Sequence, residues 1–144
     1  MANTIGMACD HAGYALKEEL KKSLEAMGYE VKDYGAYSDE SVDYPDFAHA
    51  LAEEVEKGTL NRGIAICGSG NGISMSANKH PHVRAALCWM PEIAKLAREH
   101  NDANILSLPA RFIPIEQAKE IMQIFLSTPF EGGRHERRVK KIEL

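Results

Sequence analysis

The sequence contains few cysteines, no long apolar run and no excess of positive charge. Its three cysteines, Cys9, Cys67 and Cys88, are far apart and form no CxxC pair, which argues against a disulfide framework and against a zinc cluster. The 17 Lys and Arg residues and 21 Asp and Glu residues give a net charge of −4. No overall positive field therefore attracts nucleic acid or an anionic membrane, and any anion site must be local.

Export and membrane insertion are also not indicated. The first residues, MANTIGMACDHAG, are too short and too polar for a secretory signal, and no later segment reaches the apolar length of a membrane span. Together with the unpaired cysteines, this predicts a protein of the reducing cytoplasm. At 144 residues and 44% hydrophobic content, the chain can bury a core as one domain over residues 1–144.

What the sequence does contain is an alternation of two hydrophobic periods. Short apolar segments typical of strands occupy residues 4–9, 29–35, 63–68, 83–89 and 103–109. Between them, apolar residues recur at helical spacing: Leu16, Leu20, Leu24 and Met27; Ala48, Leu51, Ala52 and Val55; and Ile115, Ala118, Met122 and Phe125. The alternation predicts an α/β fold, a doubly wound parallel five-stranded sheet with helices on both faces. Residues 128–144 follow as a basic tail with helical potential.

Ligands of open α/β sheets bind beyond the carboxyl ends of the strands. Four groups of polar residues are expected at that edge: Asp10 with His11 after the first strand, Cys67 to Gly72 after the third, His100 with Asn101 before the fifth, and Arg111 after it. Their coincidence at one edge predicts a single site.

The stretch CGSGNGIS is the most informative local pattern. Gly68, Gly70 and Gly72 let the backbone approach a ligand and present amide donors to an anion. Three familiar phosphate loops are disfavoured. A dinucleotide-binding loop has GxGxxG after the first strand, whereas this chain has GxGxG after the third. A P-loop ends in GK[ST], which is absent here, and a phosphatase loop of the Cys-x5-Arg type needs arginine where this chain has Ile73. A turn that needs glycine for packing alone is the alternative.

Cys67 lies at the junction of the third strand and this loop. A cysteine in a strand is commonly a small buried hydrophobe, and we interpret Cys9 and Cys88 in that way. At the end of a strand beside a helix start, however, a thiolate can face a ligand. A base next to a row of oxyanion donors suggests enolisation or acyl transfer.

The candidate histidines and arginines are individually ambiguous. His11 and His100 can be structural or catalytic, and Asp10 can be a cap for the helix that follows it. In the tail, Arg134 and Arg138 are four residues apart, so a helix would present both on one face to a phosphate. The alternative is a solvated basic end.

With these residues identified, the chain resembles the ribose-5-phosphate isomerase type B family, a group that includes galactose-6-phosphate isomerase subunits. The resemblance rests on CDHAGYALK, DYPDFA, ICGSGNGISMSANK, REHNDANILSLPAR and FEGGRHERRV, in this order along nearly the whole chain. It implies a Rossmann-like domain without metal or cofactor that interconverts ribose 5-phosphate and ribulose 5-phosphate. It also implies a homodimer in which residues 128–144 reach the partner's site, and it leaves open whether dimers pair into tetramers.

The resemblance further implies a role for each matching position in proton transfer. Cys67 is the base that moves a proton between C1 and C2, and amides of the loop hold the cis-enediolate: Gly68, Ser69, Gly70, Asn71 and Gly72. One subgroup of the family lacks the cysteine and has glutamate at the position of Ile73, so this chain resembles the thiol users. Ser69 stands where many of those have threonine.

The other matching positions contact the sugar or its phosphate. His100 assists opening of the furanose ring, Asp10 and Asn101 contact sugar oxygens, and Tyr44 borders the sugar. The phosphate is bound by His11 and Arg111 together with Arg134 and Arg138 of the other subunit.

Two other functions stay open at this point. An isomerase of the same mechanism could act on allose or galactose 6-phosphate, and the length of the pocket decides between pentose and hexose. A non-catalytic module that binds a sugar phosphate or nucleotide is the second, although it would have no use for Cys67 together with His100.

Overall fold

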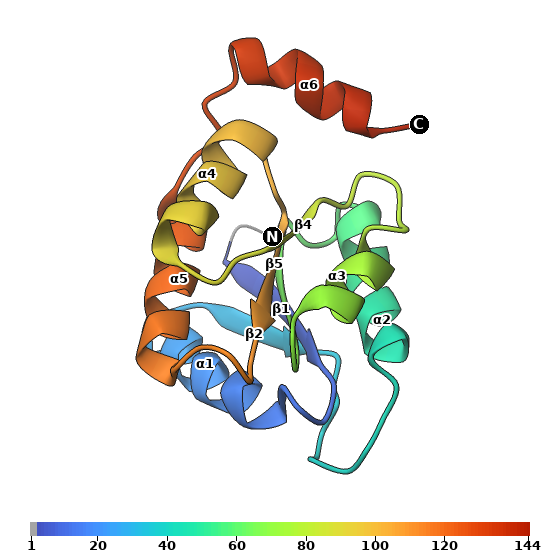
Figure 1. Cartoon of the computed structure of the whole chain (residues 1–144), viewed down its shortest axis with the longest axis vertical. Coiled ribbons are helices and arrows are strands. Elements are labelled where there is room, and N and C mark those ends of the chain that lie inside the picture. Colours follow the sequence, from blue (N-terminus) through green and yellow to red (C-terminus); the bar gives the residue numbers. More distant parts are fainter. Residues whose placement is uncertain (1–2) are drawn as a thin grey trace.

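The computed structural model describes residues 3–144 and shows five strands that alternate with helices (Figure 1). The strands are β1 (Thr4–Cys9), β2 (Glu30–Asp33), β3 (Arg62–Cys67), β4 (Ala85–Leu87) and β5 (Ile105–Pro109). The helices are α1 (Tyr14–Ala26), α2 (Tyr44–Glu56), α3 (Asn71–Ala77), α4 (Pro91–Asn101), α5 (Ile115–Ser127) and α6 (Arg134–Ile142).

All neighbouring strands pair in parallel, in the order β2-β1-β3-β5-β4. Helices α1, α4 and α5 cover one face of the sheet, and α2 and α3 cover the other (Figure 1). The predicted doubly wound parallel sheet is therefore confirmed. None of the helices described in residues 3–144 combines the length and the hydropathy of a membrane span.

The core follows from the two hydrophobic periods. Strands β1, β3 and β5 are buried along nearly their whole length because helices cover both of their faces. The helical stripes pack onto them, except that Met27 is 45% exposed and Ile115 is 43% exposed. Both lie at helix ends: Gly28, with φ +93°, turns the chain away after α1, and Ile115 is the first residue of α5.

Strand β4 is shorter than the sequence predicts. The apolar segment 83–89 forms only three strand residues, all half-buried. Because β4 is an edge strand, it has one pairing neighbour and less cover than the central strands.

The tail forms α6, which lies across the end of the molecule opposite the carboxyl ends of the strands (Figure 1). The amide of Glu131 donates to the carbonyl of Glu99 in α4 at 3.1 Å. At the far end of α6, the carboxylate of Glu143 accepts from the amide of His82 at 3.0 Å. The tail is thus fixed at both ends to the amino-end side of its own subunit.

Candidate active site

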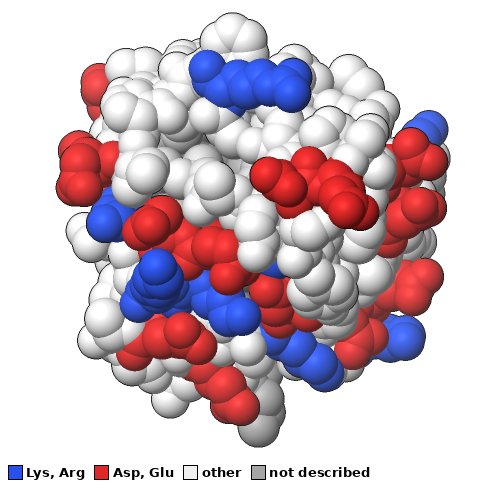
Figure 2. Space-filling model, turned by 90° about the horizontal axis from the view of Figure 1, so that it is seen from below, with Lys and Arg blue, Asp and Glu red and all other residues white. Residues whose placement is uncertain are grey.

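A cleft of about 450 Å³ opens at the carboxyl ends of β1 and β3. It is lined by Asp10, Tyr44, Cys67, Gly68, Ser69, Gly72, Arg111 and Phe112. Figure 2 views this end of the molecule and shows acidic and basic groups mixed on it, with no field of one sign. Any binding site for an anion at this end must therefore be formed by specific groups in the cleft.

Cys67 is the last residue of β3, and its side chain borders the cleft while the residue is only 4% exposed. Its carbonyl accepts from the amide of Ala110 at 2.9 Å, and the carbonyl of Gly68 accepts from the amide of Arg111 at 3.0 Å. These bonds join the loop after β5 to the loop after β3. As a result, the Arg111 side chain lies against Gly68, the residue after Cys67, and lines the same cleft.

The other two cysteines are in a different environment. Cys9 and Cys88 have no exposed surface, and burial raises the pKa of each thiol to about 12. Neither lines the cleft. Their interpretation as small buried hydrophobes agrees with this environment.

The glycine loop is required both for packing and for its amides. A Cβ on Gly72 would lie 2.5 Å from the Tyr44 ring, and a Cβ on Gly68 would lie 3.2 Å from a guanidinium nitrogen of Arg111. Gly70 has φ +78°, a conformation that favours glycine. Among residues 3–144, the amides of Gly68, Ser69 and Gly70 donate to no other group. They remain available to a ligand oxygen.

Asn71 and Ser69 contact each other at the mouth of the loop. The Ser69 hydroxyl accepts from the backbone amide of Asn71 at 3.3 Å and from its side-chain amide at 3.2 Å. Both residues are exposed. Ser69 thereby orients the first turn of α3, which starts at Asn71.

Asp10 and His11 follow β1 at the same edge of the sheet, and of the two only Asp10 lines the cleft. One oxygen of the buried Asp10 carboxylate accepts from the amide of Gly13 at 3.1 Å, so Asp10 does stabilise the turn before α1. The amide of Val42 donates to Nδ1 of His11 at 3.2 Å. In the neutral ring the hydrogen therefore lies on Nε2, which can donate to an anion.

A buried ion pair supports this edge of the sheet, and the sequence reasoning missed it. Lys17 has no exposed surface, and its Nζ lies 2.6 and 2.7 Å from the two carboxylate oxygens of Asp33 and 2.9 Å from the carbonyl of Ala36. Burial opposes ionisation of Asp33, but hydrogen bonds from Lys17 and Gly35 outweigh it and hold the pKa of Asp33 below its ordinary value. The position of Lys17 between Leu16 and Leu20 on the apolar face of α1 was the available signal.

The structure contradicts the prediction that His100 and Asn101 share this edge. They end α4 directly before β5, and residues that precede a parallel strand lie at its amino end. In this subunit they therefore lie at the opposite end of the sheet from Cys67. Arg134 and Arg138 are on α6 at that same opposite end (Figure 1). None of the four lines the cleft.

One lining residue was also absent from the sequence reasoning. Phe112 borders the cleft and is 73% exposed. A large apolar side chain with this exposure, directly after Arg111, indicates a contact surface at the rim. No local motif pointed to it.

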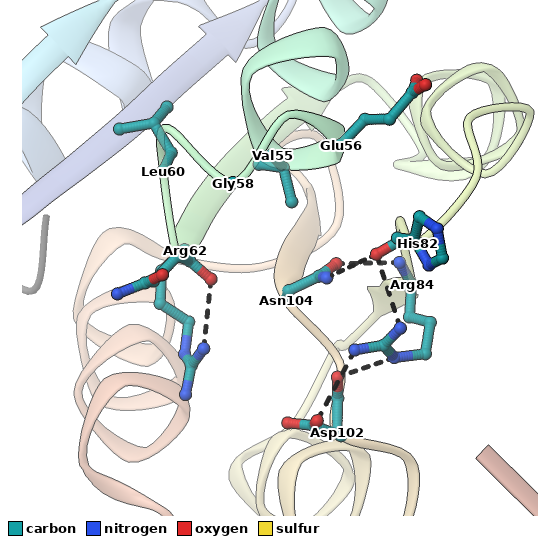
Figure 3. Close-up of a pocket in the computed structure, with 10 residues that line it drawn as sticks. Val55, Glu56, Gly58, Leu60, Arg62, His82, Arg84, Asp102 and Asn104 are labelled. Carbon is teal, nitrogen blue, oxygen red and sulfur yellow. Dashed lines mark hydrogen bonds and ion pairs between the residues drawn. The ribbon is translucent and has the colours of Figure 1, made fainter. Parts of the chain in front are cut away.

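A second hollow, of about 370 Å³, lies at the amino ends of the strands (Figure 3). Two of its charged groups, Arg84 and Asp102, lie 3.5 Å apart, and Arg84 is also 3.8 Å from Glu143 of the tail. Arg62 lies apart from them and donates to the carbonyl of Asn61. Because this hollow contains no thiol and its arginines are largely satisfied, the first cleft is the better candidate for chemistry.

The fold and the cleft define a class: an α/β protein with one thiol beside a row of free amides, an arrangement suited to enolisation. The family described as ribose/galactose isomerase matches residues 5–142. The chain therefore belongs to the ribose/galactose isomerase family.

Individual relatives extend over almost the whole chain. Ribose-5-phosphate isomerase B of Escherichia coli is 44% identical over 96% of this chain and 93% of its own. The crystal structure of a ribose 5-phosphate isomerase from Thermotoga maritima is 51% identical, with a TM-score of 0.95 over 97% of both chains. The Mycoplasma genitalium enzyme, solved with bound ribulose 5-phosphate, is 43% identical, with a TM-score of 0.93 over 96% of this chain and 93% of that one.

Proposed function

We infer that this protein is a ribose-5-phosphate isomerase of type B, which interconverts D-ribose 5-phosphate and D-ribulose 5-phosphate. The observation that carries this inference is the full-length similarity to enzymes of that name. The cleft supplies the matching chemistry, because its one thiol lies beside free amides. A reducing cytoplasm, as the free cysteines predict, suits a mechanism that depends on a thiolate.

We propose that Cys67 performs the proton transfer. As a thiolate, its Sγ removes the proton from C2 of the open-chain aldose, and negative charge develops on O1. Amides of the loop from Gly68 to Gly72 donate to the cis-enediolate, first among them the free amides of Gly68, Ser69 and Gly70. Return of the proton to C1, with transfer of the O2 proton to O1, leaves the ketose. The rate depends mainly on these fixed donors, because the carbon acid is weak.

The substrate is held by its two ends. Asp10 keeps one carboxylate oxygen free for a sugar hydroxyl, and Tyr44 borders the sugar from α2. His11 through Nε2 and Arg111 through its guanidinium bind the phosphate. Binding energy from the phosphate positions C1 and C2 against the thiol.

We further propose that each site is completed by a second subunit. His100, Asn101, Arg134 and Arg138 lie together at the end of the subunit opposite Cys67, where α6 packs on α4. In an isologous homodimer, this end of one subunit can meet the cleft of the other, and the exchange occurs twice. His100 then assists ring opening, Asn101 contacts the sugar and the two arginines bind the phosphate. Tetramers would be pairs of such dimers.

Mixing two inactive variants tests the shared site. Cys67→Ala subunits keep an intact tail, and Arg134→Ala/Arg138→Ala subunits keep an intact thiol. After equal mixing and subunit exchange, each heterodimer contains one complete site, so about a quarter of the wild-type activity should return. Exchange is verified by native mass spectrometry. Confirmed heterodimers without activity would contradict the shared site but not the isomerase function.

Substrate comparison tests the reaction itself. We expect kcat/KM for ribose 5-phosphate to exceed that for allose 6-phosphate and galactose 6-phosphate. A preference for a hexose phosphate would move the assignment to the hexose branch of the family. If the Cys67→Ala protein kept its full biological function, the result would favour the alternative function, a non-catalytic module that binds a sugar phosphate or nucleotide.

A further inference from the structure

Three potential metal ligands meet where the tail leaves α4. They are His100 at the end of α4, Glu131 in the segment before α6, and His135 in the first turn of α6. One ligand atom of each lies within 4.8 Å of the others. The two imidazole rings are stacked, with centroids 4.2 Å apart and an angle of 15° between their planes.

The backbone holds these three side chains together. The amide of Glu131 donates to the carbonyl of Glu99, the neighbour of His100. The buried Arg98 donates to the carbonyl of Thr128 at 3.0 Å and to the carboxylate of Asp102 at 2.8 Å, which fixes the end of α4 to the start of the tail. The cluster is therefore not assembled from independently moving loops.

One nitrogen in the cluster lacks a partner. His135 is 7% exposed, and its Nε2 makes no hydrogen bond among the described residues. Glu131 Oε1 lies 3.4 Å away, close enough for an ion pair but without the alignment of a hydrogen bond. Buried side-chain nitrogens are normally satisfied, so this unpaired nitrogen, close to a carboxylate and stacked against a second imidazole, is available as a ligand atom.

Two imidazoles and one carboxylate form the ligand set of zinc sites that keep a coordination position open. Zinc binds nitrogen at about 2.0–2.1 Å, which places tetrahedral ligand atoms roughly 3.4 Å apart. The three ligand atoms must therefore draw together slightly. A metal also lies in the plane of each ring that binds it, so coordination requires one imidazole to tilt out of the stack.

We propose that His100, Glu131 and His135 form an inhibitory site for a divalent transition cation of the zinc class. The proton transfer proposed for Cys67 uses no metal. A bound ion engages the imidazole of His100 and rotates it out of the stacked orientation, so that it no longer assists opening of the furanose ring. The inhibitory part rests on the proposed function, whereas the binding part does not.

Cobalt binding to the Cys67→Ala protein tests the site without interference from the thiol. Co²⁺ accepts the same ligands as Zn²⁺ and reports its geometry by visible absorption. We expect one ion per subunit, with a tetrahedral spectrum and no sulfur charge-transfer band. Adding Glu131→Gln should weaken binding by roughly tenfold or more. The matched control is Glu136→Gln, a glutamate of the first turn of α6 that pairs with Lys140 instead, and it should bind as before.

Inhibition is then measured on proteins with the native thiol. Zn²⁺ should slow isomerisation by the wild type, EDTA should restore it, and Glu131→Gln should keep its basal activity but resist Zn²⁺. Equal cobalt affinity in the Glu131→Gln and Glu136→Gln proteins would overturn the site. Zinc that binds without slowing the reaction would overturn its inhibitory role. A protein without isomerase activity in metal-free buffer would refute the proposed function, while the cobalt titration would still decide the metal site.

Discussion

The two ends of the sheet place their reactive groups in different ways. At the carboxyl end, the thiol extends from Cys67, the last residue of β3, and the free amides of residues 68–70 belong to the turn that follows directly. At the amino end, His100, Arg134 and Arg138 extend as side chains from two helices. The carboxyl end therefore offers backbone donors at fixed positions next to a thiol, as stabilisation of an oxyanion requires, whereas the amino end offers long side chains that reach out from helices.

Each end nevertheless contains one buried cation that ties loops together. Lys17, with no exposed surface, joins α1 to Asp33 and Ala36 near the cleft. Arg98, 2% exposed, joins α4 to the start of the tail. Both are satisfied by carboxylate and carbonyl oxygens, as buried charges must be. Separate buried cations thus stabilise the two halves of the proposed site, so a substitution in one half can leave the structure of the other half unchanged.

Removing the thiol should have the largest effect. Cys67→Ala deletes the base, and we expect a loss on the order of 10³-fold or more in kcat in both directions. Initial rates with ribose 5-phosphate and with ribulose 5-phosphate measure it, and Cys88→Ala is the control with near-normal rates. Substantial residual activity would show that Cys67 is not the base.

Alkylation should separate the three cysteines by about 100-fold or more. Because burial raises the pKa of Cys9 and Cys88 to about 12, almost no thiolate of either exists at pH 8. Iodoacetamide should therefore label Cys67 first, and ribose 5-phosphate should protect it. Peptide mass spectrometry over time gives the three rates. Uniform, unprotected labelling would remove the distinction between Cys67 and the core thiols.

Truncating one arginine of α6, at the amino end of the sheet, should reduce kcat/KM by a smaller factor. Arg138→Ala removes one charge-assisted contact to the phosphate, worth about 1.5–3 kcal/mol, or about 10- to 150-fold in kcat/KM. Arg137→Ala is the matched control, since Arg137 is exposed on another face of α6. Steady-state kinetics of both variants test the prediction. Equal losses would indicate a general effect of tail charge rather than a specific contact.

His100→Asn should produce the smallest change at low enzyme concentration, with kcat/KM reduced by the same factor in both directions, as reversibility requires. The role in ring opening appears at high enzyme concentration. Without His100, the rate from ribose 5-phosphate should level off at the uncatalysed rate of ring opening, while the rate from ribulose 5-phosphate keeps rising with enzyme. Progress curves over a range of enzyme concentrations measure both. A forward rate that stays proportional to enzyme would exclude this role.

The sequence by itself determined the features that depend on neighbouring residues. The hydrophobic periods specified five strands and their helices, and CGSGNG placed a thiol directly before a glycine turn, so the carboxyl-end half of the site was recognisable without coordinates. That glycines 68 and 72 also make room for Arg111 and Tyr44 emerged only from the packed chain, because those contacts join distant segments.

The tertiary structure decided which groups share an end of the sheet. The position of His100 before β5 already implied the amino end, but the expectation of one site in one subunit led to the wrong edge. The burial of Lys17, the stack of His100 on His135 and the return of the tail to its own α4 depend on contacts between segments up to tens of residues apart. Local patterns do not encode such contacts, because they arise only when the whole chain has packed.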